Sequence, residues 1–242
     1  MSPFQKAIDS GDIYTVFQPL VDLNSKTVYG YESLVRSKLE EYPNPPRLLA
    51  GAINNSFLGR LGRELRRMSV EGCPQYPLFL NIHPDEFDEG WLVRPDDHIM
   101  LHDRDVFLEI TESVPLSHYR YCHSVLAEVR RRGAKIAVDD LGAGYSNLKY
   151  IADLEPDVVK LDRELIAGLT NESRLHRLVT SIVELCTALG AKVVAEGIET
   201  RDELKAVIDT GAHYGQGYFL ARPATPPPTV DWDELMQRGG VR

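Results

Sequence analysis

The chain has 242 residues, 43% of them hydrophobic and 26% charged, which is typical of a globular protein with a sizeable core. Its net charge of −9 disfavours a broad binding surface for a nucleic-acid polymer or an anionic membrane. It has no signal-peptide pattern, no long apolar span and no CxxC pair among its three cysteines, so we expect a soluble, cytoplasmic protein without membrane contact, disulfide framework or zinc site.

Short apolar runs bounded by turn residues alternate with helical patterns along most of the chain. The runs predict strands at residues 15–21, 28–35, 77–82, 106–111, 135–140, 158–162, 192–197 and 214–220. Eight such units in this length predict one α/β domain over residues 1–242, a (β/α)₈ TIM-type barrel with its core at about 14–223. Residues 22–27 are too few for a parallel crossover, so we expect the first strand to run antiparallel.

Helical patterns lie between these strands. An apolar stripe repeats every four residues from Leu49 to Leu65 and predicts one helix, and a second stripe runs from Leu175 to Leu189. A third pattern, residues 119–129, ends before Gly133, which suits the position after a helix. The tail, residues 224–242, contains three consecutive prolines and predicts an extended piece before a short helix at 232–238.

Polar side chains lie near the carboxyl end of every predicted parallel strand. They are Glu32, Asn81, Glu109, Asp139, Asp140, Lys160, Glu196 and Gln216. In a barrel these ends form one rim, where active sites of this fold lie. A single carboxylate at a strand end is ordinarily a loop residue, a helix cap or half of a salt bridge. Five carboxylates that converge on one rim repel one another and are costly to bury, and divalent cations relieve both problems.

The type of donor narrows the choice of metal. Every candidate ligand on the rim offers oxygen, which favours Mg²⁺ or Mn²⁺ over Zn²⁺. His98 and His102 have helical spacing, but the charged residues around them predict a solvated loop. The adjacent pair Asp139 and Asp140 can serve two ions, which is the usual apparatus for displacement at phosphorus.

Together these residues resemble the EAL domain family of cyclic di-GMP phosphodiesterases, from about Phe17 to Pro223. The matching segments, in family order, are 17–21 (FQPLV), 32–36 (ESLVR), Asn81, 109–113 (EITES), 139–146 (DDLGAGYS), 160–163 (KLDR), 196–200 (EGIET) and 216–218 (QGY). The resemblance implies a barrel with an antiparallel first strand and hydrolysis of cyclic di-GMP to linear pGpG by two-metal activation of water. It also implies Mg²⁺ or Mn²⁺ as cofactor, inhibition by Ca²⁺, and a mobile loop at residues 141–146.

The resemblance assigns a role to each matching position. The implied metal ligands are Glu32, Asn81, Glu109, Asp139, Asp140 and Glu196. Glu196 is the implied general base, Lys160 orients the attacking water, and Glu112 steadies the mobile loop. The implied substrate-binding residues are Gln18, Arg36, Asp140, Glu199 and Gln216. A planar arginine fork such as Arg36 suits two phosphate oxygens.

Some positions depart from the family pattern. Ser33 replaces the central alanine of the family signature, which begins at Glu32. Leu141 and Ala143 replace common residues of the mobile loop, and His213 stands where aspartate is common. The main alternative is therefore a receptor that binds cyclic di-GMP without efficient turnover. Enolate chemistry on carbon acids is a second alternative, but the aspartate pair and Arg36 favour phosphate. The resemblance is also compatible with a homodimer, which the sequence neither shows nor excludes, and with a sensory domain upstream if the chain is a piece of a longer protein.

Overall fold

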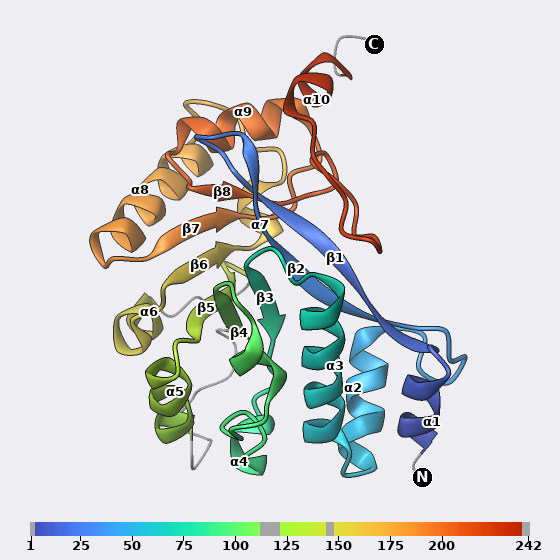
Figure 1. The fold of residues 1–242 in the computed structure, drawn as a ribbon. Coiled ribbons are helices and arrows are strands. Elements are labelled where there is room, and N and C mark those ends of the chain that lie inside the picture. Colours follow the sequence, from blue (N-terminus) through green and yellow to red (C-terminus); the bar gives the residue numbers. More distant parts are fainter. Residues whose placement is uncertain (1–2, 112–121, 144–147, 239–242) are drawn as a thin grey trace.

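Eight strands close into one barrel in chain order, with the helices around its outside (Figure 1). The computed structural model describes residues 3–111, 122–143 and 148–238. The strands are β1 Ile13–Asp22, β2 Thr27–Ser37, β3 Leu78–Asn81, β4 Val106–Thr111, β5 Lys135–Leu141, β6 Val158–Leu161, β7 Lys192–Ala195 and β8 Tyr214–Gly215. The helices are α1 Pro3–Asp9, α2 Pro45–Asn54, α3 Leu58–Gly72, α4 Glu86–Glu89, α5 Cys122–Arg131, α6 Leu148–Leu154, α7 Arg163–Ile166, α8 Arg174–Ala188, α9 Arg201–Asp209, α10 Trp232–Arg238 and a 3₁₀ helix at His98–Leu101.

The first strand runs antiparallel to both of its neighbours, as predicted. β1 pairs antiparallel with β2 and with β8, whereas the other neighbouring strands pair in parallel. The Asp22 carboxylate closes the hairpin by accepting hydrogen bonds from the backbone N–H groups of Asn24 (3.0 Å) and Ser25 (2.7 Å). The short connection therefore fixes the direction of β1.

Two expected elements differ from the structure. The apolar stripe from Leu49 to Leu65 is divided between α2 and α3, because Asn55 caps the end of α2 with a side-chain bond to the Gly51 carbonyl and Ser56 has φ +51°. β8 ends at Gly215 instead of 220 because the chain beyond it bonds to the segment after β7: the Phe219 N–H donates to the Ile198 carbonyl. The predictions of one continuous helix and of a long last strand are wrong.

The tail after the barrel lies along β1. Phe17 and Ala224 exchange two backbone hydrogen bonds of 2.8 and 3.0 Å, and the Thr225 hydroxyl donates to the Thr15 carbonyl. The predicted short helix is confirmed as α10, and Trp232 packs against the main core. The tail thus covers the side of β1 where no barrel strand pairs with it.

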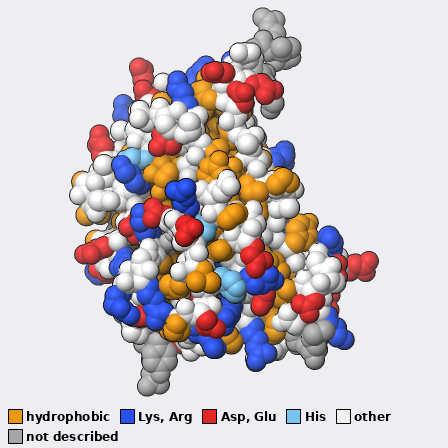
Figure 2. Space-filling view, in the orientation of Figure 1, with side chains coloured by type: hydrophobic (Ala, Val, Ile, Leu, Met, Phe, Trp, Pro, Cys, Tyr) orange, Lys and Arg blue, Asp and Glu red, His pale blue; other side chains and the backbone are white. Residues whose placement is uncertain are grey.

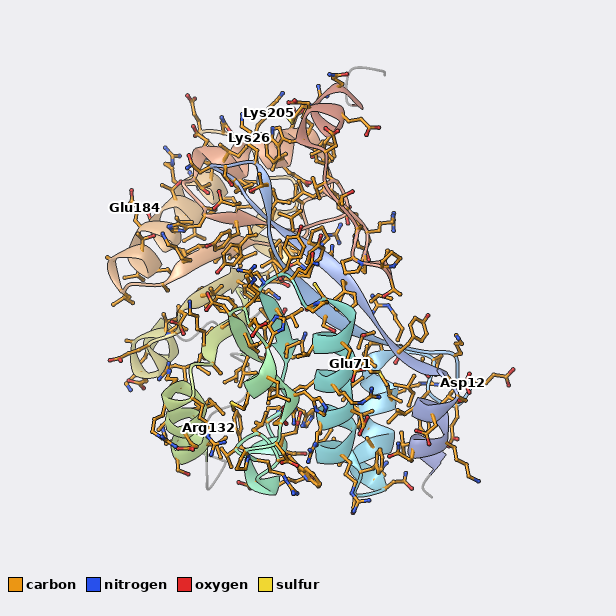
Figure 3. All side chains as sticks on the ribbon, viewed as in Figure 1. Asp12, Lys26, Glu71, Arg132, Glu184 and Lys205 are labelled. Atoms are coloured by element: carbon orange, nitrogen blue, oxygen red, sulfur yellow. The ribbon has the colours of Figure 1, made fainter. Side chains whose placement is uncertain are left out.

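Apolar side chains fill the space between the barrel and its helices, and Cys73, Cys122 and Cys186 are buried there as free thiols. Charged side chains such as Glu71 on α3, Glu184 on α8 and Lys205 on α9 are exposed (Figure 3). On the face shown in Figure 2, groups of both signs are interspersed. None of the helices in the described ranges combines the length and the apolar character that crossing a bilayer requires.

Candidate active site

Two layers of side chains fill the barrel interior. The first is apolar and aromatic: Leu20, Phe79, Phe107, Ala137, Val158, Val194 and Tyr214. Because a side chain returns to the same face of a strand every second residue, the residue two positions further along each parallel strand also points inward. That second layer is polar: Asn81, Glu109, Asp139, Lys160, Glu196 and Gln216, with Glu32 from β2. Gln18 comes two residues before Leu20 because β1 runs in the opposite direction, and it lies opposite Glu32 in the register.

Lys160 is the centre of the polar layer. Its Nζ lies 2.6 Å from Glu109 Oε1, 2.7 Å from Glu196 Oε1, 3.1 Å from Asp139 Oδ1 and 3.4 Å from Glu32 Oε2. The ammonium group is buried, and it joins carboxylates from four other strands or strand ends. A single cation therefore balances only part of the negative charge gathered here.

Two amides orient Glu32. Asn81 Nδ2 donates to Glu32 Oε1 over 3.0 Å, and Gln216 Nε2 donates to Oε2 over 2.7 Å. Burial favours the neutral form of Glu32, but Lys160 and the two amides together lower its pKa. The Glu32 carboxylate is thus held ionised in a fixed orientation. Because the Asn81 nitrogen is engaged by Glu32, the oxygen of the same amide is the atom that can bind a ligand.

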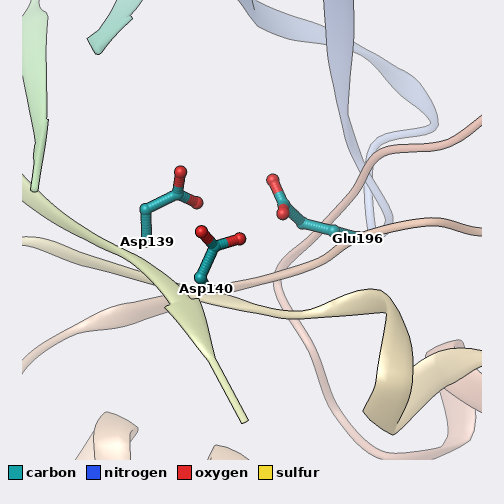
Figure 4. A group of neighbouring side chains, drawn as sticks. All are labelled: Asp139, Asp140 and Glu196. Atoms are coloured by element: carbon teal, nitrogen blue, oxygen red, sulfur yellow. The ribbon is translucent and has the colours of Figure 1, made fainter. Parts of the chain in front are cut away.

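Asp140 joins the cluster through an irregularity in β5. Strict alternation would turn it away from Asp139, but the register with β6 shifts between Val138 and Leu141, and Asp140 has φ +60°. Oxygens of Asp139, Asp140 and Glu196 consequently lie within 4.8 Å of one another (Figure 4). The local backbone strain serves to bring a second aspartate into the site.

The cluster is electrostatically strained. Burial, followed by the charge of Glu32, raises the pKa of Glu109. Burial also raises the pKa of Glu196 to about 8, and burial with the Asp139 charge raises the pKa of Asp140 to about 6. Burial would lower the pKa of Lys160, but the surrounding carboxylates raise it instead, so the ammonium stays charged.

These residues fit a pair of divalent cations. When all five carboxylates are ionised, they outnumber the one ammonium group by four negative charges, which two divalent cations would balance. Glu109 Oε2 is buried and has no hydrogen-bond partner within the described part of the chain. Carboxylate and amide oxygens are the ligands that Mg²⁺ and Mn²⁺ prefer. A metal cluster would relieve both the repulsion and the unpaired oxygen.

Two hollows flank the cluster and share Glu32 and Leu34. The first, about 310 Å³, is lined by residues of β2, α2 and α3. Its lining includes metal-ligand candidates and Arg36 as well as leucines such as Leu49 and Leu58. The second, about 360 Å³, lies beside β7 and β8. Its polar lining residues are Gln18, Glu32, Arg163, Glu196, Glu199, Gln216 and Tyr218. A ligand at the cluster can therefore extend in two directions.

The structure brings the predicted rim residues together and adds contacts that were not predicted. Gln18, Arg36 and Glu199 line the hollows, and Glu199 Oε1 lies 2.9 Å from Arg163 NH2. Glu112 and residues 144–146 of the predicted mobile loop lie outside the described residues.

The prediction of a solvated loop around His98 and His102 is wrong in part, because the segment forms a 3₁₀ helix and Asp97 and Ile99 are buried. Asp97 is fully buried and bonds the Arg66 guanidinium, whose NH1 also lies 2.8 Å from Glu86 Oε2. Arg66 and Glu86 line the first hollow, so this ion-paired group forms part of its wall. The sequence does not predict this ion-paired group, because its three members are 11 to 31 positions apart. The charged residues around His98 are the one local feature that points to it, and they are typical of a solvated loop.

Comparisons with known proteins agree with this geometry. The EAL domain model matches residues 2–223. Cyclic di-GMP phosphodiesterase PA2567 of Pseudomonas aeruginosa is 32% identical in an alignment of 232 residues that covers 90% of this chain and 40% of that protein. Among solved structures, the calcium/cy-diGMP complex of Klebsiella pneumoniae BlrP1 matches with TM-score 0.77 and 28% identity over 95% of this chain and 60% of that one. The c-di-GMP complex of PaMucR phosphodiesterase matches with TM-score 0.76 and 26% identity over 88% of this chain and 97% of that one. The chain thus spans less than half of the curated relative.

Proposed function

The chain belongs to the EAL domain family, and from this membership we propose that it is a metal-dependent phosphodiesterase that hydrolyses cyclic di-GMP to linear pGpG. The observation that carries the proposal is the polar layer around Lys160. It retains each carboxylate and amide that such chemistry needs, and the similar PaMucR structure is that of a phosphodiesterase in complex with c-di-GMP.

We assign the metal ligands from this layer. Glu32, Asn81, Glu109 and Asp139 would hold one ion, while Asp139 and Asp140 would hold the other. Bound Mg²⁺ or Mn²⁺ would supply Lewis acidity at the phosphate and make water a better nucleophile at neutral pH. We further propose that Ca²⁺ supports binding but inhibits turnover, in keeping with the calcium complex of the Klebsiella relative.

The chain's own residues then move the proton and hold the substrate. Glu196, whose Oε1 lies 2.7 Å from Lys160 Nζ beside the aspartate pair, accepts the proton of the attacking water, and Lys160 orients that water. Arg36 and Gln18 bind phosphate and ribose oxygens beside the cluster. The water oxygen forms a bond to phosphorus, the bond from phosphorus to the 3′ oxygen breaks, and the proton passes to that oxygen.

A timed assay tests this proposal. The protein is incubated with cyclic di-GMP and Mg²⁺, Mn²⁺ or Ca²⁺, and pGpG is separated from further products by chromatography. We expect pGpG with the first two ions only, and its loss in Glu32→Ala and Asp139→Ala but not in the surface control Asp153→Ala. Tight binding of cyclic di-GMP with no pGpG in either ion would identify a receptor instead.

We extend the proposal to the protein's setting. The free buried thiols fit a reducing compartment, so we propose that the enzyme acts in the cytoplasm on a small nucleotide. The curated relative is more than twice as long as the matched segment, which leaves room for an upstream sensory domain. That domain and a homodimer stay predictions, to be checked by mass measurement of the full-length protein in solution.

A further inference from the structure

Arg163 lines the second hollow, and contacts on both sides of its side chain fix its position. It begins α7, directly after β6, and its side chain crosses to the segment after β7. A Cβ at Gly197 would lie only 2.4 Å from Arg163 Cγ, so the glycine makes room for the arginine stem. Arg163 NH2 then lies 2.9 Å from Glu199 Oε1.

The residue that pairs with Arg163 is itself fixed. The Glu199 backbone N–H donates to Glu203 Oε2 over 2.9 Å, and Glu203 also completes the cap at the start of α9 with Thr200. Because the loop that carries Glu199 is held in this way, the ion pair orients the guanidinium although both side chains are about half exposed. A guanidinium has five N–H donors, so the pair with Glu199 leaves donors for a ligand.

The charged side chains that line the second hollow are mostly negative. Its described lining residues include three glutamates, and Arg163 is the only arginine or lysine among them. In the first hollow Arg36 can serve a phosphate, whereas Arg66 is already engaged by Asp97 and Glu86. Without Arg163, the only charged side chains among the described lining residues of the second hollow would be the three glutamates.

We propose that Arg163 is a further substrate-binding residue, which binds the phosphate of the cyclic dinucleotide that is not cleaved, and that Glu199 acts as its positioning residue. This inference rests on the proposed function. The two phosphodiesters lie on opposite sides of one ring, so when one phosphate reaches the metal ligands the other lies to the side of the cluster. Arg163 offers that phosphate a planar fork, and Glu199 holds the fork in place.

Calorimetric titration with two ligands tests the inference. In Ca²⁺, cyclic di-GMP, which has two phosphodiesters, is compared with the linear dinucleoside monophosphate GpG, which has one. We expect Arg163→Ala to weaken the binding of cyclic di-GMP about tenfold and that of GpG less than about twofold. Arg131→Ala is the matched control, because it removes another exposed arginine–glutamate pair, with Glu128, far from the rim.

The outcomes separate the two proposals. Equal weakening of both ligands, or no weakening of either, would overturn the role of Arg163 while leaving the phosphodiesterase proposal intact. If the unmodified protein binds no cyclic di-GMP and forms no pGpG, the proposed function fails and the role of Arg163 fails with it. Arg163→Lys keeps the charge but loses the fork, so we expect it to bind cyclic di-GMP more weakly than the unmodified protein and more tightly than Arg163→Ala.

Discussion

Lys160 Nζ lies 2.6 Å from Glu109 Oε1, and both side chains are buried inside the barrel. Burial raises the pKa of Glu109 although the ammonium group is so close. One lysine therefore satisfies this carboxylate only in part, and it is shared with Glu196, Asp139 and Glu32. The metal-free site is therefore short of positive charge.

Lys160→Met should destabilise the metal-free protein by about 3–5 kcal/mol, because buried carboxylates lose their common partner. Divalent cations neutralise the same carboxylates, so Mn²⁺ should reduce the difference. The measurement is urea unfolding in EDTA and in Mn²⁺. Lys205→Met, which removes an exposed pair with Asp202, is the control and should change little. An equal loss of stability in both conditions would contradict the explanation.

Gln216→Ala should weaken Mn²⁺ binding about tenfold, because Glu32 Oε2 loses the amide that orients it. Calorimetric titration with Mn²⁺ measures the change directly, without need of turnover. The exposed Gln75→Ala provides a control for loss of an amide elsewhere. Unchanged affinity would show that Asn81 alone suffices to hold Glu32.

β2 is joined to α3 by a hydrogen bond between two hydroxyl groups. Ser69 Oγ donates to the Leu65 carbonyl over 2.7 Å, so the hydrogen between Ser33 Oγ and Ser69 Oγ, 2.7 Å apart, comes from Ser33. Ser69→Ala should cost about 1–3 kcal/mol in the free energy of unfolding, because it leaves the buried Ser33 donor without an acceptor. Ser33→Ala combined with Ser69→Ala should recover most of that loss. Urea unfolding of Ser69→Ala, Ser33→Ala and the double variant checks the cycle, and a double variant less stable than Ser69→Ala would refute it.

The metal-free protein should lose stability as the pH rises from about 5 to 8. The pKa of Asp140 is raised to about 6 and that of Glu196 to about 8, so the folded state holds protons that the unfolded chain releases near pH 4. This contribution is therefore complete at acid pH and is lost as the pH passes the two folded values. Melting temperatures in EDTA should show the decline.

Glu196→Gln should remove much of this pH dependence, because the amide does not titrate. The exposed Glu184→Gln is the matched control and should leave the slope unchanged. Added Mn²⁺, which binds the deprotonated carboxylates, should also flatten the profile. A slope that persists in Glu196→Gln would assign the dependence to other groups.

The sequence predicts the site well where the rule is local. Alternation along a strand and the shared rim of parallel strands place Glu109, Asp139 and Lys160 together without knowledge of any distant contact. Asp140 breaks that alternation, and only its place in the aspartate pair indicated that it joins the cluster. Side-chain placement within each strand could thus be predicted before its partners were known.

The remaining features depend on contacts between distant parts of the chain. Arg66, Glu86 and Asp97 look like separate surface charges in the sequence, and only packing of α3 against the 3₁₀ helix buries them together. The division between α2 and α3 depends on a single turn at Asn55 and Ser56, which an apolar repeat of four residues conceals. Strand β8 ends early because the chain beyond it forms hydrogen bonds with the segment after β7.

The direction of β1 decides where a neighbouring domain would attach. Ile13 pairs with Ser37, at the carboxyl end of β2, so the polypeptide arrives at the face of the barrel that bears the metal-ligand candidates. Phe4 of α1 stacks there on Tyr42 and on Phe57. Phe57 immediately precedes α3, which lines the first hollow. A regulatory domain fused ahead of Pro3 would adjoin the face that bears the metal-ligand candidates, with α1 and then β1 as the direct connection to β2 and Glu32.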